Sequence, residues 1–188
     1  MIRETRETLV EVEWAPRGES NPEVATGIGF LDHMLGQWAF HGGFELRLTC
    51  QGDLGVDAHH TVEDVALALG EEMDRVLGDR AGLARFGWAY APLDEALSRA
   101  VVDLVKRPHC SFRAAPLPEM LGQLPGEMVP HFFRSLSSSG RFTLHLDLLH
   151  GENAHHRVES AFKAFGLALA QAVMVRGRDA ASTKGTMG

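Results

Sequence analysis

A His-His-x-x-Glu stretch occurs twice in this chain, and it constrains the possible folds more than any other feature. Residues 59–63 read His-His-Thr-Val-Glu, and residues 155–159, 96 positions later, read His-His-Arg-Val-Glu. Upstream, His33 precedes the first stretch by 26 residues and His131 precedes the second by 24. Landmarks that recur in the same order at nearly the same spacing indicate two copies of one structural unit.

The apolar periodicity supports this duplication. It predicts helices over residues 30–41, 60–77, 127–138 and 155–175, and strands over residues 7–14, 44–50, 97–106, 109–114 and 142–149. Residues 17–29 read as a loop with at most a short strand. Each half therefore reads strand, strand, helix, strand, helix.

This order predicts an α+β fold with a duplicated half-domain, each half a mostly antiparallel sheet with helices on one face. We expect the halves to be residues 1–86 and 87–188, together one compact catalytic unit. The two halves would bury a shared core between their helix layers or between their sheets, and the sequence leaves this choice open.

Composition limits the partners and the compartment. The net charge of −7 argues against a nucleic-acid partner. No apolar run approaches the roughly 20 residues of a membrane span, and no apolar segment follows the polar N-terminus as in a signal peptide. Cys50 and Cys110 are interpreted as reduced residues of a cytoplasmic protein, with a single disulfide as the alternative.

Helix geometry turns the repeated stretch into a prediction of two metal sites. Residues i and i+4 share a helix face, so His59 and Glu63 can bind one ion together, and so can His155 and Glu159. The neighbouring histidines, His60 and His156, are rotated by about 100° and should serve a second ion.

One histidine from another helix, His33 or His131, would complete the coordination shell of each ion. A single His-His pair at a helix start is usually just solvated, and a lone helical histidine usually belongs to the core, but the repetition favours metal binding. Imidazole with carboxylate and no thiolate suits Mn, Fe or Zn. Which ligand serves which ion stays open.

Around these residues the chain resembles the imidazoleglycerol-phosphate dehydratases, lyases of histidine biosynthesis, over nearly its whole length. The resemblance rests on five motifs in the same order: Thr-Gly-Ile-Gly-Phe-Leu-Asp-His-Met-Leu (26–35), Asp-Ala-His-His-Thr-Val-Glu-Asp-Val (57–65), Pro-Leu-Asp-Glu-Ala-Leu (92–97), Gly-Glu-Asn-Ala-His-His (151–156) and Ser-Thr-Lys-Gly (182–185). Since no phosphatase domain precedes the match, we expect the monofunctional form.

The resemblance implies a ribosomal-protein-S5-domain-2-like fold, two Mn²⁺ ions per active site, and a large homo-oligomer of roughly 24 copies with active sites between subunits. It carries eight metal ligands onto His33, His59, His60, Glu63, His131, His155, His156 and Glu159. It places substrate and phosphate contacts at Gln37, Arg85, Arg107, Lys163, Ser182 and Lys184. Glu7, in an Arg-Glu-Thr stretch, matches the acid–base glutamate.

The implied reaction is loss of water from D-erythro-imidazole glycerol phosphate to give imidazole acetol phosphate. The hydrogen to be removed is not beside a carbonyl, so the imidazole ring is the only electron reservoir. Two ions could hold the ring as imidazolate, which would expel the hydroxyl as a diazafulvene forms; deprotonation would then give an enol and the ketone. The alternatives are a two-metal phosphohydrolase and a non-catalytic metal-storage assembly.

Overall fold

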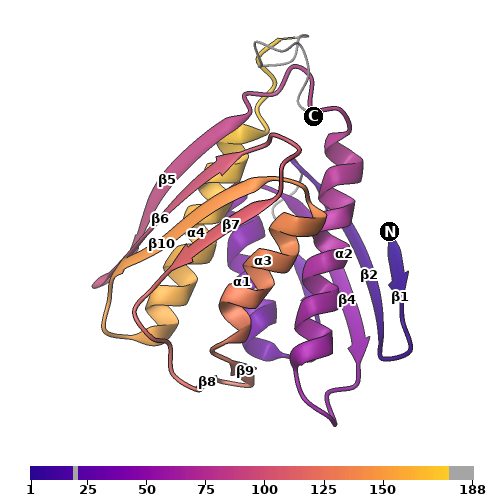
Figure 1. Ribbon diagram of the computed structural model, residues 1–188, viewed down its shortest axis with the longest axis vertical. Coiled ribbons are helices and arrows are strands. Elements are labelled where there is room, and N and C mark those ends of the chain that lie inside the picture. Colours follow the sequence, from indigo (N-terminus) through magenta and orange to yellow (C-terminus); the bar gives the residue numbers. More distant parts are fainter. Residues whose placement is uncertain (19–20, 178–188) are drawn as a thin grey trace.

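The computed structural model describes residues 1–18 and 21–177, which form two four-stranded sheets and the helices between them (Figure 1). The first half contains β1 (Ile2–Glu4), β2 (Thr8–Ala15), β3 (Glu23–Ala25), α1 (Gly29–Gly42), β4 (Glu45–Gly52) and α2 (His59–Leu77). The second half contains β5 (Phe86–Leu93), β6 (Ala96–Asp103), β7 (His109–Arg113), β8 (Met120–Leu121), β9 (Leu124–Pro125), α3 (Met128–Ser139), β10 (Thr143–His150) and α4 (Ala154–Ala172).

The two sheets have the same topology. Their strand orders are β1-β2-β4-β3 and β5-β6-β10-β7. In each sheet two neighbouring pairs are antiparallel and the last pair, β3 with β4 or β7 with β10, is parallel. The predicted α+β fold with a duplicated half-domain is therefore confirmed, and both halves contain the predicted order of elements.

The periodicity did not predict β1 in the first half, nor β5 and the short pair β8 and β9 in the second. The pattern of β5 is inverted, because its large side chains, Phe86, Trp88 and Tyr90, are exposed while Gly87 and Ala91 are buried. A Cβ at Gly87 would lie 1.9 Å from the carbonyl oxygen of Ala168 in α4. Only small residues fit beneath that helix, so the buried face of β5 carries almost no apolar signature.

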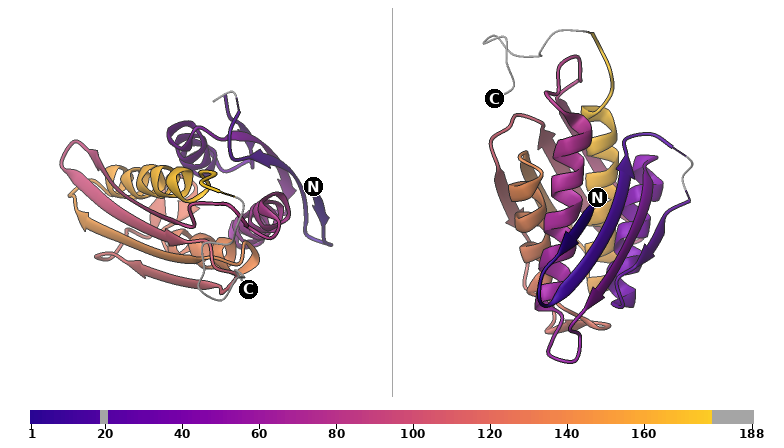
Figure 2. Two further views of the ribbon diagram at one scale, coloured as in Figure 1. Left: turned by 90° about the horizontal axis from the view of Figure 1, so that it is seen from above. Right: turned by 90° about the vertical axis from the view of Figure 1, so that its right-hand side faces the viewer.

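The helix layers, rather than the sheets, meet in the shared core. Seen from above, the helices lie between the two sheets (Figure 2). Helix α1 of the first half packs on α4 of the second, and α3 of the second packs on α2 of the first. Two glycines at equivalent positions, Gly70 and Gly166, permit this, because a Cβ there would lie 2.6 Å from Leu136 O and 2.5 Å from Trp38 O respectively.

None of the helices in the described part of the chain is long and apolar enough to cross a membrane. Cys50 and Cys110 are both free. Burial raises the pKa of each thiol to about 11, so neither supplies a thiolate at neutral pH.

Arg80 links the two halves by hydrogen bonds, at the end of the molecule opposite the paired histidines. Its side chain is fully buried and donates to the carbonyl oxygens of Leu104, Gly140 and Arg141 and to the Asp74 carboxylate, at 2.5–3.0 Å. We expect Arg80→Ala to lower the free energy of unfolding by about 3–5 kcal/mol, because it leaves three carbonyls without their donor and Asp74 with only its 3.5 Å ion pair to Arg141.

Guanidinium chloride titrations of the wild type and the variant measure this change. Arg47→Ala is the matched control, since Arg47 is exposed and its ion pairs are 3.9 Å long; we expect a change of about 0.5 kcal/mol or less. Equal effects of the two substitutions would show that Arg80 does not fasten the halves.

Candidate metal centre

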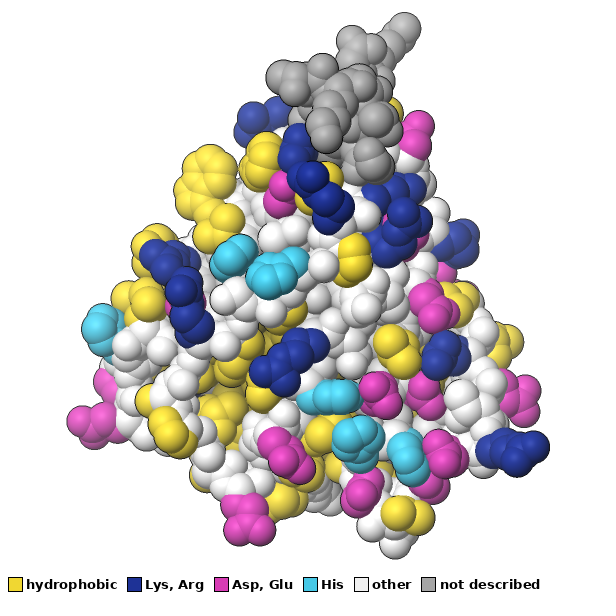
Figure 3. Space-filling model, in the orientation of Figure 1, with side chains coloured by type: hydrophobic (Ala, Val, Ile, Leu, Met, Phe, Trp, Pro, Cys, Tyr) yellow, Lys and Arg dark blue, Asp and Glu magenta, His cyan; other side chains and the backbone are white. Residues whose placement is uncertain are grey.

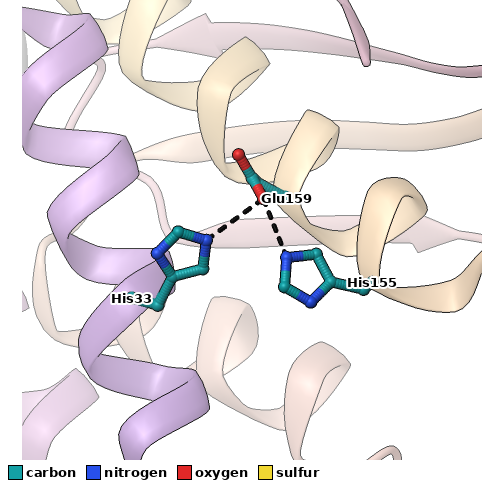
Figure 4. Close-up of side chains that lie close together, drawn as sticks. All are labelled: His33, His155 and Glu159. Atoms are coloured by element: carbon teal, nitrogen blue, oxygen red, sulfur yellow. Dashed lines mark hydrogen bonds and ion pairs between the residues drawn. The ribbon is translucent and has the colours of Figure 1, made fainter. Parts of the chain in front are cut away.

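The first cluster of possible metal ligands joins His33 of α1 to His155 and Glu159 of α4. Nε2 of His33 lies 3.1 Å and Nε2 of His155 lies 2.9 Å from the same Glu159 oxygen. Figure 4 shows both rings turned toward this carboxylate from two different helices. His155 and Glu159 are one helical turn apart, so their shared face follows from local geometry.

Glu159 is held in its ionised form. Burial by itself raises the pKa of this carboxyl, but hydrogen bonds from Lys163, His33 and His155 outweigh burial and lower the pKa to about 2. The Lys163 ammonium lies 2.6 Å from the second Glu159 oxygen. The group therefore remains a carboxylate throughout the range in which proteins work.

The second cluster repeats this arrangement with His131 of α3 and the pair His59 and Glu63 of α2. Nε2 of His131 lies 3.1 Å from one Glu63 oxygen, and Nε2 of His59 lies 3.9 Å from the other. The Asp57 carboxylate accepts from the His59 backbone N–H at 2.7 Å and so shapes the start of α2. Both clusters therefore cross between the halves, as the packing of α1 on α4 and of α3 on α2 requires.

His60 and His156 point away from these clusters and engage other carboxylates. Nδ1 of His60 lies 2.9 Å from Asp53, and Nδ1 of His156 lies 2.9 Å from Glu95. The hydrogen bond to Asp53 raises the pKa of His60, and the one to Glu95 raises the pKa of His156. Sequence reasoning missed Asp53 and Glu95, although Glu95 belongs to the Pro-Leu-Asp-Glu-Ala-Leu motif.

Glu7 lies in the turn between β1 and β2, close to His60. Its Oε2 atom is 3.6 Å from His60 Nδ1, and its side chain is half exposed. Thr5 Oγ1 accepts from the backbone N–H groups of Glu7 and Thr8, and Asp64 of α2 accepts from Thr8 Oγ1 and Arg3 Nε. Asp64 thus ties the turn, and Glu7 with it, to the helix that carries His60.

The predicted phosphate-binding residues divide between two opposite ends of the molecule. Lys163 contacts Glu159, and Gln37 lies one turn beyond His33 on α1. Arg85 instead pairs with Asp103 at 2.7 Å, and its backbone N–H donates to Ala172 O at the far end of α4. The exposed Arg107 lies just before β7, and its carbonyl accepts from Thr143 Oγ1 at the start of β10. Ser182 and Lys184 lie outside the described residues.

The same division is visible on the surface. Histidine and acidic side chains gather on the lower part of the face in Figure 3, and several Lys and Arg side chains gather near its upper end. Helix α4 has 19 residues between these ends, which corresponds to about 28 Å at 1.5 Å per residue.

Both clusters fit a divalent cation. Within each, the three candidate donor atoms, two imidazole nitrogens and one carboxylate oxygen, lie within 4.8 Å of one another. Two donors at about 2.1 Å from one ion can be up to about 4.2 Å apart, so small side-chain rotations suffice. This donor set suits Mn, Fe or Zn, and three donors leave coordination positions for further ligands.

Comparison with known proteins places this geometry in a family. Residues 26–169 match the family model described as imidazoleglycerol-phosphate dehydratase. The imidazoleglycerol-phosphate dehydratase of Chlorobium chlorochromatii is 48% identical over 97% of this chain and 93% of that protein. The one from Rubrobacter xylanophilus is 49% identical over 98% of this chain and 95% of that protein.

Solved structures agree with the sequence matches. The crystal structure of IGPD from Pyrococcus furiosus, in complex with (S)-C348, has a TM-score of 0.85 at 35% identity and covers 99% of both chains. The imidazoleglycerol-phosphate dehydratase of Staphylococcus aureus has a TM-score of 0.80 at 34% identity, with 93% of this chain and 98% of that chain covered.

Proposed function

Because the chain belongs to the imidazoleglycerol-phosphate dehydratase family, lyases of histidine biosynthesis, we propose that it dehydrates D-erythro-imidazole glycerol phosphate at a site with two Mn²⁺ ions. The product is imidazole acetol phosphate. The observation that carries this proposal is the pair of matching clusters, each with two imidazoles and one carboxylate. Two such clusters suit a substrate whose imidazole ring has two nitrogens.

The first ion would be held by His33, His155 and Glu159, and the second by His59, Glu63 and His131. When bound, the ions supply the Lewis acidity that holds the substrate ring as imidazolate and fix its orientation. His60 and His156 supply the remaining ligands, because their Nδ1 atoms are engaged within the chain and their Nε2 atoms are left for a metal.

Glu7 performs the proton transfer. The hydrogen that leaves the substrate is not beside a carbonyl, so a positioned base is needed at that carbon. Glu7 is half exposed, is fixed by its turn, and lies beside His60. It takes the proton from the substrate carbon, the neighbouring hydroxyl leaves and is protonated to water, and the resulting enol becomes the ketone as its O–H proton is lost and its carbon takes up a proton.

The substrate is bound between copies of the chain in a large homo-oligomer. Arg85 and Arg107 lie about one α4 length, roughly 28 Å, from the His155 end, whereas the substrate is a small molecule. Within one chain these arginines therefore cannot hold the phosphate of a substrate bound at the clusters. In the oligomer, Arg85 and Arg107 of a neighbouring copy lie beside the metal clusters of this copy, where Lys163 and Gln37 already lie. The planar guanidinium groups suit the phosphate.

Incubation of the Mn-loaded protein with imidazole glycerol phosphate tests the proposal. We expect the keto product in step with substrate loss and no free phosphate. Release of inorganic phosphate would instead indicate a phosphohydrolase, and no reaction would indicate metal storage; either result contradicts the proposal. Metal analysis of protein purified without added metal distinguishes Mn from Fe and Zn.

Metal binding should depend steeply on pH. Asp53 and Glu95 raise the pKa of His60 and His156, so a proton competes with the metal for these rings at higher pH than for an ordinary histidine, whose pKa is about 6.5. We expect activity at limiting Mn²⁺ to fall as the pH decreases from about 8 to 6. The pH profile of the initial rate measures this, and a profile flat down to about pH 5 would contradict it.

A further inference from the structure

In each His-His-x-x-Glu motif, one histidine points away from the metal cluster, and one carboxylate contacts its ring. Asp53 Oδ2 lies 2.9 Å from His60 Nδ1, and Glu95 Oε2 lies 2.9 Å from His156 Nδ1. An ionised carboxylate only accepts hydrogen bonds, so the ring nitrogen that faces it must carry the proton. In a neutral imidazole the other nitrogen, Nε2, is then free to bind a metal.

The Glu95 carboxylate is fixed on both of its oxygens. Oε1 accepts from the backbone N–H groups of Glu152 at 3.2 Å and Asn153 at 2.9 Å, while Oε2 faces His156. Asn153 in turn caps α4 by accepting from the N–H groups of His155 and His156. The turn between β5 and β6 is thereby connected both to the start of α4 and to one of its rings.

Glu95 and Glu7 occupy equivalent positions in the two halves. Each is the last residue before the second strand of its sheet, since β2 begins at Thr8 and β6 begins at Ala96. Their contacts differ, however. Glu95 lies within hydrogen-bond distance of His156, whereas Glu7 is 3.6 Å from His60 and Asp53 occupies the closer place.

We propose that Asp53 and Glu95 are positioning residues that hold His60 and His156 with Nδ1 protonated and Nε2 turned toward a metal ion. The inference rests on the proposed function in one respect, namely that these two histidines are metal ligands. In the second half the turn glutamate itself orients the ring. In the first half Asp53 has taken over this task, which leaves the equivalent Glu7 free for proton transfer.

Glu95→Gln is the sharpest test, because the surroundings determine how the new amide must lie. Two backbone N–H groups face the Oε1 position, so the amide oxygen stays there and the NH₂ group faces His156. The ring must then accept at Nδ1, which places its proton on Nε2 and blocks that atom as a ligand. At His60 the test is Asp53→Ala, which removes the acceptor outright; Asp53 Oδ1 has no hydrogen-bond partner among the described residues, so nothing would fix the amide of an asparagine there.

Each control removes a carboxylate charge near one of these histidines without changing the hydrogen bond at its Nδ1 atom. Asp94→Asn lies in the same turn as Glu95, at a φ of 47° that asparagine tolerates, and Asp94 acts on His156 only through its charge. Asp57→Asn is the counterpart for Asp53, because the asparagine oxygen can still accept from the His59 N–H.

The measurement is a Mn²⁺ titration of the full-length protein without substrate, with free Mn²⁺ followed by electron paramagnetic resonance. We expect Glu95→Gln and Asp53→Ala each to weaken Mn²⁺ binding by about 10- to 100-fold, the usual loss when an outer partner of a ligand is removed. Asp94→Asn and Asp57→Asn should stay close to the wild type.

Wild-type affinity in Glu95→Gln and Asp53→Ala would overturn the inference, and so would an equal loss in the two controls, which would indicate an effect of charge alone. Since the titration contains no substrate, these outcomes do not depend on which reaction the protein catalyses. A failed dehydration assay together with the expected titration would reject the proposed reaction and leave the positioning role intact.

Discussion

Glu7→Gln is expected to lower kcat by about 10²–10⁴-fold while it leaves Mn²⁺ affinity and KM nearly unchanged. The substitution keeps the shape of the side chain but removes the group that takes and returns the proton, and general acid–base catalysis typically contributes a factor of this size. The turn that carries Glu7 is held through the backbone and through Asp64, so it should persist in the variant. Steady-state rates at saturating Mn²⁺ measure the change.

Glu4→Gln serves as the matched control, because Glu4 is an exposed glutamate of the neighbouring strand β1. Its kcat should equal that of the wild type. If Glu7→Gln retains most of its activity, Glu7 does not transfer the proton. A loss of Mn²⁺ affinity in Glu7→Gln would instead show that this carboxylate supports His60, the task that we assign to Asp53.

Two nearly inactive variants should restore activity when they assemble together. Alone, Glu7→Gln lacks the proton-transfer group, and Arg107→Ala should lose about 10- to 100-fold in kcat/KM because a charged contact to the phosphate is missing. These residues lie at opposite ends of the molecule, so a site of the proposed kind, between copies, takes them from different copies. After random mixing of equal amounts, about one site in four contains both native residues, and roughly a quarter of wild-type activity should return.

Co-expression with two different affinity tags isolates the mixed oligomers for this assay. Glu7→Gln mixed with Glu7→Ala is the control, and it should remain inactive because every site lacks the same residue. If the mixture of Glu7→Gln and Arg107→Ala also remains inactive, Glu7 and Arg107 act within one chain, and the proposal of sites between copies is wrong.

Much of the fold could be predicted because its elements are encoded locally. The apolar spacing of residues 60–77 predicted α2 (His59–Leu77) to within one residue. The predicted helix over 155–175 began within one residue of α4 but ran three residues beyond its end at Ala172. Strand β5 was not predicted, because its partner helix lies so close that the buried positions are Gly87 and Ala91. Periodicity detects large buried side chains and fails where packing demands small ones.

The sequence by itself determined which residues of each motif share a helix face, because the i and i+4 relation depends only on the helix. It also separated His60 and His156 from that face. Only the tertiary structure decided that His33 joins His155 and that His131 joins His59. The reason is that helices from opposite halves cross at Gly70 and Gly166, where the absence of a Cβ lets the backbones approach.

The partners of the outward histidines were likewise decided by the tertiary structure. Asp53 is seven residues from His60, but Glu95 is 61 residues from His156 and reaches it only because the turn between β5 and β6 meets the start of α4. The repeated His-His-x-x-Glu stretch thus specifies the chemistry of the ligands. The packing of the two halves specifies which ligands meet, since contacts between distant segments depend on the whole fold.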